Sequence, residues 1–313
     1  MPYLRLLVVG GLLLLVGAQA ERDKRGYATS RLVLDIDNVG SAAVSSITGG
    51  NVTADVVAEP VTGKGVAGKR LGQTRIVPVT VEVAAGDLAP WISQTLSGTA
   101  LKVNGRILEL DANNSVVAER QFTNATLTEF TLPALDASSR EPARMKLTFQ
   151  PEAITTKSGG GAKAPALSDA KAKRPLASAF RVTIPGVDCT GVAKVEPITI
   201  TFKLVSAASG TDRTSQKNIG ETVAGDLVLT VADAKAGGFV QWHDQAVVRG
   251  DATGAEKTAT VELLTPDLKT AILTLEGQGV GIVTVRPPAM PAGAADQARR
   301  VEAQMYVEQW RVK

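Results

Sequence analysis

The chain has few of the residues on which most catalytic sites depend. Its 313 residues include one cysteine, Cys189, and one histidine, His243, and only 4% of the residues are aromatic. A single cysteine cannot form an intrachain disulfide, and a single histidine cannot build a metal site from several imidazoles. Folding must therefore rest on core burial or on assembly. We expect no enzyme activity, no cofactor and no metal.

The chain also lacks an excess of charge of one sign. It has 34 Lys and Arg residues against 31 Asp and Glu residues, for a formal net charge of +3. The two signs are interspersed, so no basic face for nucleic acid is visible and we expect no nucleic acid binding. The densest basic stretch lies in residues 155–178, which are rich in Gly, Ala, Pro and Ser, and a solvated linker is the simplest interpretation. Its members are Lys157, Lys163, Lys171, Lys173 and Arg174.

No apolar run is long enough to span a bilayer comfortably. Leu6–Val16 is a short run that follows Arg5 and precedes the small-x-small pattern Ala18-Gln19-Ala20. These features predict a secretory signal peptide over residues 1–20 with cleavage after Ala20. A retained anchor is the alternative, and the shortness of the run argues against it. We expect a secreted or periplasmic protein that leaves the membrane after cleavage.

The residues that are present favour β-sheet. The composition is rich in Val, Ala, Thr and Gly, which suits strands and turns. Residues 105–154 illustrate this, with a strand at 107–110, a polar turn at 111–115 and a return strand at 116–122. A break at Leu132-Pro133 follows, and the segment closes on a strand in which Met145, Leu147 and Phe149 alternate with polar residues. This pattern predicts an all-β module.

The same pattern occurs a second time along the chain. An offset of 148 relates residues 32, 34 and 36 to 180, 182 and 184, and residues 52, 54 and 56 to 200, 202 and 204. Offsets of 150, 151 and 153 then relate Val77, Val79 and Val81 to Leu227, Leu229 and Val231, Trp91 to Trp242, and Phe122 to Leu275. Several matches in one order predict an internal duplication with loop insertions.

Each half is predicted to hold one short helix. In the first half Asp87 is expected to cap a helix that carries Leu88, Trp91, Ile92 and Leu96 on one side and stops at Gly98. Phe239 and Trp242 form the matching face in the second half. The predicted fold is mainly β, with two tandem β-sandwich or barrel modules and one short helix each. We expect the signal peptide at 1–20, the first module at 21–155, a flexible linker at 156–178 and the second module at 179–313.

Three motifs invite a chemical interpretation, and a structural one fits each better. Residues 63–70 nearly match a phosphate-binding loop, but Arg70 stands where Ser or Thr should hold magnesium, and a strand follows instead of a helix. A glycine-rich hairpin loop is the better interpretation. Asp35 and Asp37, and likewise Asp111–Ser115, lack the further oxygen ligands of a calcium loop. For Asp111–Ser115, turn chemistry is the better interpretation.

Two further groups contain candidate nucleophiles. Cys189 would need a base, and only His243 is available, so a Cys189–His243 pair is the one cysteine chemistry left open. A small buried apolar residue is the simpler role for Cys189. The loop Asp136–Glu141 has serines and acids but no histidine partner, so its short side chains are expected to fix a turn. We therefore assign no catalytic, cofactor-binding or metal-binding residues.

Ordered features of residues 31–154 resemble the tail tube proteins of contractile phages and related injection systems. The features are the short helix with Trp91, the turn at 111–114, the sequence Phe122-Thr123-Asn124-Ala125 and the loop 135–141. The second half lacks a counterpart of that loop and has residues 287–298 in its place, so it is the more divergent module. The resemblance implies that the loop at 63–70 is the tip of an extended hairpin that touches a neighbouring ring.

The resemblance also implies a structural role. Modules of that family associate through their sheets into six-membered rings that stack into tubes, so a tandem chain would build a ring from three copies. We expect an exported protein that self-assembles into rings, tubes or filaments, with further copies of itself as the partner. The alternative is a monomeric secreted binding module or adhesin that keeps the tail-tube fold.

Overall fold

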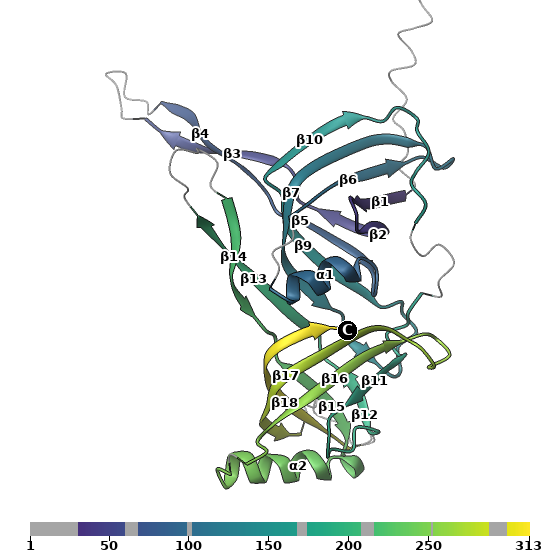
Figure 1. The fold of residues 1–313 in the computed structure, drawn as a ribbon, viewed down its shortest axis with the longest axis vertical. Coiled ribbons are helices and arrows are strands. Elements are labelled where there is room, and N and C mark those ends of the chain that lie inside the picture. Colours follow the sequence, from purple (N-terminus) through teal and green to yellow (C-terminus); the bar gives the residue numbers. More distant parts are fainter. Residues whose placement is uncertain are drawn as a thin grey trace, which may run out of the picture.

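The computed structural model describes residues 31–59, 68–98, 102–167, 174–207, 216–251, 253–287 and 299–313. The predicted signal peptide, residues 1–20, lies outside them. The described chain forms two β-sheet bodies stacked along the long axis of the molecule, with one helix in each (Figure 1). The predicted fold class, mainly β with two modules and one short helix in each, is confirmed.

The first body is a closed barrel. Its strands follow the order β6-β1-β2-β5-β9, and β7 pairs with both β6 and β9, which joins the two ends. A closed barrel has no free edge within the ring of strands, so every strand in it has two neighbours. The strands are β1 (Arg31–Ile36), β2 (Gly40–Thr48), β5 (Val79–Ala84), β6 (Val103–Leu110), β7 (Val116–Leu132) and β9 (Arg144–Gln150).

Apolar side chains at alternate positions of the strands fill the interior of this barrel. Met145, Leu147 and Phe149 of β9 are fully buried, as their alternation with polar residues predicts. The rings of Phe149 and Trp91 lie 5.7 Å apart in an edge-to-face arrangement, so the helix α1 (Ala89–Leu96) closes onto the strands through an aromatic contact. Outside the barrel, β10 (Ala153–Ser158) pairs with the first part of β7.

The second body is built from seven strands in the order β11-β16-β17-β18-β15-β12-β8. The residues just before β11 connect β8 to β16. Asp136 N–H donates to the Ala177 carbonyl, and Leu264 N–H donates to the Ala179 carbonyl. The strands are β8 (Leu135–Asp136), β11 (Phe180–Thr183), β12 (Val192–Val195), β15 (Leu227–Ala232), β16 (Glu256–Leu264), β17 (Ala271–Arg286) and β18 (Arg300–Val312).

The segment predicted as a flexible linker, residues 156–178, is attached at both ends. Residues 156–158 belong to β10, and Ala177 is buried and bonded to Asp136. Between them, Ala164 and Leu167 cover a small apolar cluster on the outer face of the first barrel, around Leu108. The Gly/Ala/Lys composition hid these contacts, because small residues pack closely as readily as they form linkers. The domain boundaries drawn at 155 and 179 stay a prediction.

The two helices lie in matching places, but one predicted cap is wrong. The N-cap of α1 is Leu88, not Asp87, and Leu88 adopts a left-handed conformation (φ 58°) with no side-chain cap bond. The buried face of α1 is as predicted, with Trp91, Ile92 and Leu96, and Gly98 (φ 85°) follows its end. The second helix, α2 (Gly237–His243), is flanked by a 3₁₀ turn at Asp233–Lys235 and a π-turn at Asp244–Val248.

Two long hairpins leave the barrels on the same side of the molecule (Figure 1). The first consists of β3 (Val52–Ala58) and β4 (Lys69–Ile76) and forms a sheet of its own. The second consists of β13 (Ile198–Ala207) and β14 (Gln216–Val223). The base of β13 pairs with the end of β7, so this hairpin joins the sheet of the first barrel although it comes from the second half of the chain. We call the two hairpins the first arm and the second arm.

The strand registers of the two modules correspond, with offsets that differ from those expected from the sequence. The pair Val79–Phe149 of β5 and β9 corresponds to the pair Leu227–Met305 of β15 and β18. The offset is therefore 148 at β5, not 150. Helix α1 begins at residue 89 and α2 at residue 237, so Trp91 corresponds to Phe239 and not to Trp242.

The position of a bulge gives the sequence offset between the two long strands, β7 and β17. Between β6 and β7 the register shifts around Asn124 (φ 50°), and between β16 and β17 it shifts around Gly279 (φ 59°). The offset is therefore 155 for β7 and β17, and Phe122 corresponds to Gly277 instead of Leu275. The arms match at 148: Gly72 lies against Val57 in one, and Gly220 against Val205 in the other.

The two barrels share one core. A single cluster of buried apolar side chains runs from Leu34 of the first barrel to Trp310 of the second. Phe130 of β7 is fully buried at the junction, opposite Ile200 of β13. Because apolar burial is the main stabilising contribution, the two modules should not unfold independently.

We expect Phe130→Ala to lower the free energy of unfolding by about 3–5 kcal/mol, since it removes a buried ring at the junction. Urea denaturation followed by tryptophan fluorescence should show one transition, shifted as a whole. Val205→Ala on the exposed part of the second arm is the control, with a change within about 0.5 kcal/mol. Two separate transitions, only one of them shifted by Phe130→Ala, would contradict a shared core.

Candidate assembly surfaces

The first arm exposes apolar side chains that nothing in the described chain covers. Val52, Val56 and Leu71 are 56%, 64% and 74% exposed. The outer edges of β3 and β4 pair with no other described strand. A two-stranded hairpin that is not packed on other elements is marginally stable in water. The arm therefore has the properties of a surface that is completed by a partner.

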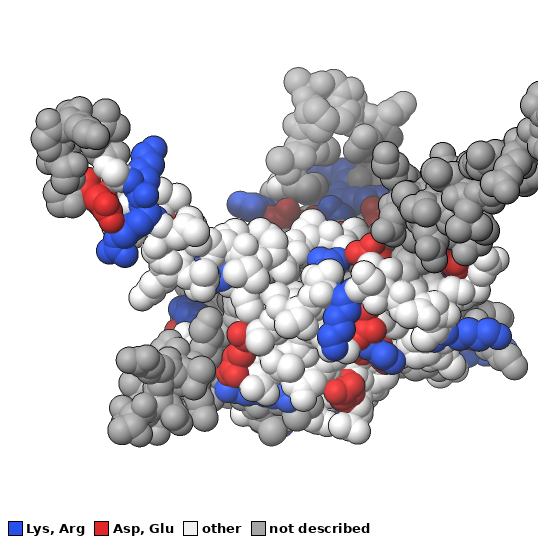
Figure 2. Space-filling view, turned by 90° about the horizontal axis from the view of Figure 1, so that it is seen from above, with Lys and Arg blue, Asp and Glu red and all other residues white. Residues whose placement is uncertain are grey.

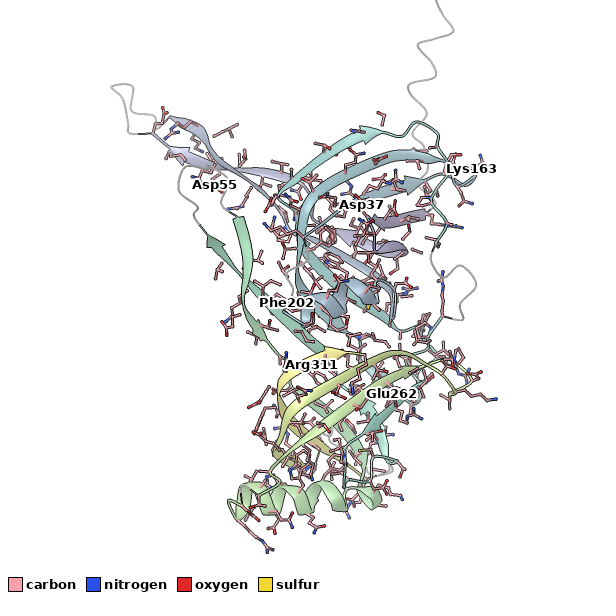
Figure 3. All side chains as sticks on the ribbon, in the orientation of Figure 1. Asp37, Asp55, Lys163, Phe202, Glu262 and Arg311 are labelled. Carbon is pink, nitrogen blue, oxygen red and sulfur yellow. The ribbon has the colours of Figure 1, made fainter. Side chains whose placement is uncertain are left out.

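The polar residues of the first arm interact with each other. Arg75 pairs with Asp55 at 3.0 Å, and Arg70 with Glu59 at 3.5 Å; all four are largely exposed, and Asp55 lies on the arm in Figure 3. Exposed ion pairs of this kind contribute little to stability. Lys69, the lysine of the phosphate-loop-like sequence, begins the strand β4. The structural context thus agrees with a hairpin, and residues 60–67 at its tip lie outside the described residues.

The second arm is partly covered. Ile198, Ile200 and Phe202 at its base are buried, and Phe202 lies where β13 leaves the first barrel (Figure 3). Beyond the base, Val205 is exposed. The difference between the arms is thus at their bases: the second pairs with β7 as a strand, whereas the first has no strand partner in the described chain and is held by the Gln150 side chain, which donates to the Ile76 carbonyl at 3.2 Å.

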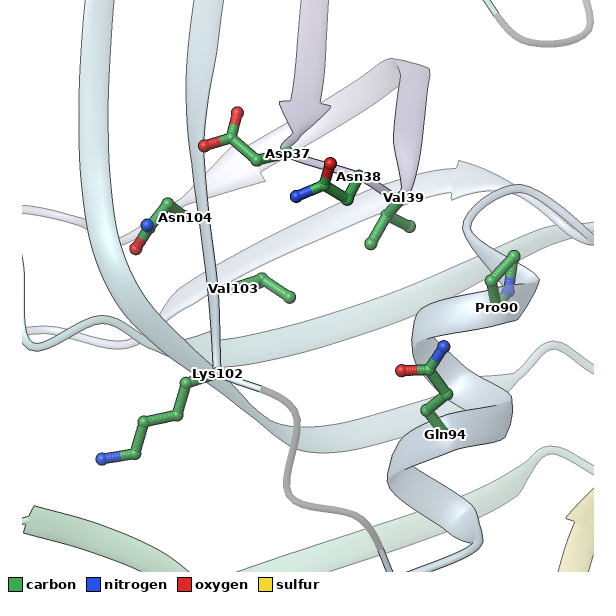
Figure 4. A pocket seen from close by; sticks show the side chains of 8 residues that line it. All are labelled: Asp37, Asn38, Val39, Pro90, Gln94, Lys102, Val103 and Asn104. Carbon is green, nitrogen blue, oxygen red and sulfur yellow. The ribbon is translucent and has the colours of Figure 1, made fainter.

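Two hollows lie away from the arms. The smaller, of about 280 Å³, lies between the turn at Asp37–Val39 and α1 (Figure 4). Lys102 at its rim points away and bonds Glu152 at 2.8 Å. The larger, of about 820 Å³, is a crevice between the modules, lined by Ala85 and Pro142 on one side and Ile272 on the other.

The residues considered for chemistry have structural surroundings. Cys189 is half-buried and packs against the core, and burial raises the pKa of its thiol. His243 is the last residue of α2. Asp35 accepts hydrogen bonds from Ser41 Oγ (2.5 Å) and Arg106 Nε (2.9 Å). Both oxygens of its carboxylate are thus bonded to side chains of the same sheet. Across the described ranges, no three His, Cys, Asp or Glu residues cluster closely enough to hold a metal ion.

The predicted turns form as their chemistry requires. Asp111 Oδ1 accepts the backbone N–H groups of Asn113 and Ser115, both at 2.8 Å, and Asn114 takes the left-handed conformation (φ 59°). Asp136 Oδ1 accepts the N–H and the hydroxyl of Ser138, and these bonds lower the pKa of its carboxyl. Asx chemistry thus accounts for both motifs.

The sequence reasoning missed a third such turn beside the cysteine. Asp188 Oδ1 accepts the N–H and hydroxyl of Thr190, and its other oxygen accepts a bond from Lys235. The bonds from Thr190, followed by that from Lys235, lower the pKa of Asp188 to about 2. The available signal was the spacing Asp-x-Ser/Thr, which Asp188-Cys189-Thr190 shares with Asp136-Ala137-Ser138.

Figure 2 shows a largely uncharged face on which Lys and Arg residues and Asp and Glu residues are scattered among one another. None of the helices in the described parts of the chain has the length and apolar character needed to cross a membrane.

No family model and no curated protein matches the chain. Solved structures similar to part of it include the sheath-tube complex of an extracellular contractile injection system, with 17% identity, a TM-score of 0.40, and coverage of 46% of this chain and 99% of that chain. The tube-terminating cap of the anti-feeding prophage has 22% identity, a TM-score of 0.37, and coverage of 43% and 93%. Hcp1 from Flavobacterium johnsoniae has 17% identity, a TM-score of 0.29, and coverage of 44% and 99%. These are proteins of the kind that the sequence resemblance predicted.

We expect Thr190→Val to raise the pKa of Asp188 from about 2 toward its usual range, because it removes the hydroxyl that contributes most to the shift. Lys235→Ala should raise it less. Since the folded-state pKa is lowered, the contribution of this carboxylate to stability is present above its unfolded pKa and lost as pH falls toward 2. Carboxyl NMR titration measures both variants, and a larger effect of Lys235→Ala would contradict this assignment.

Proposed function

We propose that the mature chain is an exported structural protein that self-assembles into rings, tubes or filaments through the edges of its β-sheets. The observation that carries the proposal is the first arm. Its apolar side chains, Val52, Val56 and Leu71, are exposed, and its strand edges have no described partner. An exposed strand edge with unpaired N–H and C=O groups is a template for pairing with another chain.

The arrangement of the modules supports a repeating assembly. The chain already joins two similar modules by pairing β13 of one with β7 of the other. A contact between unlike surfaces of identical subunits generates a ring if the rotation closes and a filament if it does not. Three chains with two modules each would supply a ring of six, as the tail-tube resemblance implies.

The proposed location is outside the cytoplasm. Residues 1–20 have the charge, the short apolar run and the small-x-small site of a secretory signal. Assembly would then begin after cleavage at Ala20, in the periplasm or outside the cell. The chain would act through its shape and its contacts, with no reaction of its own.

We expect purified mature protein, residues 21–313, to form rings or stacked particles that negative-stain imaging resolves. Sedimentation should show a species of about three chains whose amount rises with concentration, because association follows mass action. Dispersed monomers over a wide range of concentration and salt would overturn the proposal and favour a monomeric binding module.

The exposed part of the first arm should matter for contacts between rings. We expect Leu71→Lys to leave the melting temperature within about 2 °C, since the side chain is 74% exposed, and to shorten or abolish stacks. Leu268→Lys is the matched control, the same change at an exposed residue of the turn before β17. If Leu71→Lys formed stacks of normal length, the first arm would not take part in the contact between rings.

A further inference from the structure

The joint between the two modules is a specific strand pairing. Ile198, Ile200 and Thr201 of β13 lie opposite Leu132, Phe130 and Glu129 of β7 in an antiparallel ladder. Ile200 and Phe130 are both fully buried there. We call the base of the second arm, residues 198–201, the donor strand of this joint, and the end of β7, residues 129–132, the acceptor strand.

The donor has an unoccupied counterpart in the first module. The offset of 148 that relates the arms carries Ile200 to Val52 and Thr201 to Thr53. Ile200 is fully buried, whereas Val52 is 56% exposed. The edge of β3 that faces away from β4 has no partner among the described strands. Val52 is exposed, therefore, because the strand that covers Ile200 in the joint has no equivalent beside β3.

The acceptor also has an unoccupied counterpart, in the second module. The offset of 155 carries Phe130 to Val285 and Glu129 to Thr284. On one side of β17, β18 pairs as far as Arg286; on the other side, β16 pairs only as far as Gly281. Residues 282–286 thus have an edge with no partner in the described chain, and Val283 within it is 45% exposed.

We propose that β3 of one chain adds to the free edge of β17 in a second copy and repeats the internal joint between chains. Since Ile200 lies opposite Phe130, Val52 would lie opposite Val285, and Thr53 opposite Thr284. This inference rests on the proposed self-assembly and deepens it by naming the two surfaces that meet. The occupant of each surface is a second copy of the same chain.

The helices provide an independent sign of the same missing neighbour. In the internal joint α1 packs against the end of β18, where Ser93 Oγ donates to the Val312 carbonyl. Ile92 of α1 is fully buried, and its counterpart on α2, Val240, is 50% exposed. The counterpart of the end of β18 is β10, through an offset of 156. In the contact between chains, β10 of the chain that donates β3 would cover α2 of the second copy.

The joint between chains would be smaller than the one within a chain. Two valines replace an isoleucine and a phenylalanine, so less apolar area is buried. Pro287 stands at the position of Leu132 and has no N–H to donate to a partner strand. The modules of one chain would thus stay joined while chains exchange, which gives assembly a dependence on concentration.

Cysteine cross-linking tests the register. In a Cys189→Ser background, a Thr53→Cys chain is mixed with a Thr284→Cys chain and oxidised. Directly opposite residues have Cβ atoms about 4.5–5.5 Å apart, close enough for a disulfide with slight adjustment. We expect a disulfide dimer in the mixture at several times the level of either chain alone. A mixture of Thr53→Cys with Lys269→Cys, an exposed residue before β17, is the matched control.

A blocking variant tests the same contact without oxidation. We expect Val52→Lys to require about tenfold or more protein to reach the same ring fraction, because it places a charge in the joint. Val205→Lys, the same change at a comparably exposed position on the second arm, should leave that concentration unchanged. Thermal unfolding of both variants verifies that the monomer stays folded.

The outcomes separate the two proposals. Rings without the mixed disulfide, and with Val52→Lys assembling like wild type, would overturn this joint and leave self-assembly standing. Wild-type protein that stays monomeric at every concentration would overturn self-assembly and this joint with it. The mixed disulfide together with loss of rings in Val52→Lys would support both.

Discussion

The structure depends on one strand, β7, whose two edges are shared among four partners. Its first part pairs with β6 on one edge and β10 on the other, and its last part pairs with β9 and β13. A buried strand must satisfy its backbone N–H and C=O groups along its whole length. The 17 residues of β7 do this by closing the first barrel and then receiving the second module. The bulge at Asn124 lies between the first part and the last part of this strand.

The duplicated strand β17 shows what the second module lacks. It keeps the bulge, with Gly279 in place of Asn124, and it keeps its pairing with the strands on both sides of the bulge. What is missing is the partner that β13 supplies to β7. The difference in exposure between Phe130 and Val283–Val285 therefore records an absent neighbour and not a different fold. One architecture used twice thus yields one occupied joint and one open joint in the same chain.

Period-two patterns predicted most strands and could not fix their offsets. Met145, Leu147 and Phe149 were predicted from alternation and are buried. A shift of two residues preserves that alternation, which is why Val77 was matched where Val79 belongs, and Phe122 was matched to Leu275 instead of Gly277. The left-handed Leu88 leaves no local signal, and the docking of β13 on β7 is a choice of partner between segments far apart. The turns at Asp111 and Asp136 were predictable because their bonds span only a few residues. For the assembly surfaces, the sequence predicted the first arm as an extended hairpin, but not the free edge of β17.

Several polar side chains of the described chain are engaged in local hydrogen bonds and ion pairs. Asp35 bonds Ser41 and Arg106, Asp188 bonds Thr190 and Lys235, and the exposed arm pairs its own charges. Groups engaged in turns and ion pairs leave little over for converging on a ligand. The backbone edges of β3 and β17 are among those without a described partner, and exposed valines lie beside them. In the proposed assembly a strand of another copy pairs with each of these edges, and any sequence of suitable alternation can form such a strand. A contact formed by strand edges needs no compact motif, so the two surfaces named in the proposed assembly are found only when the registers of the two modules are compared.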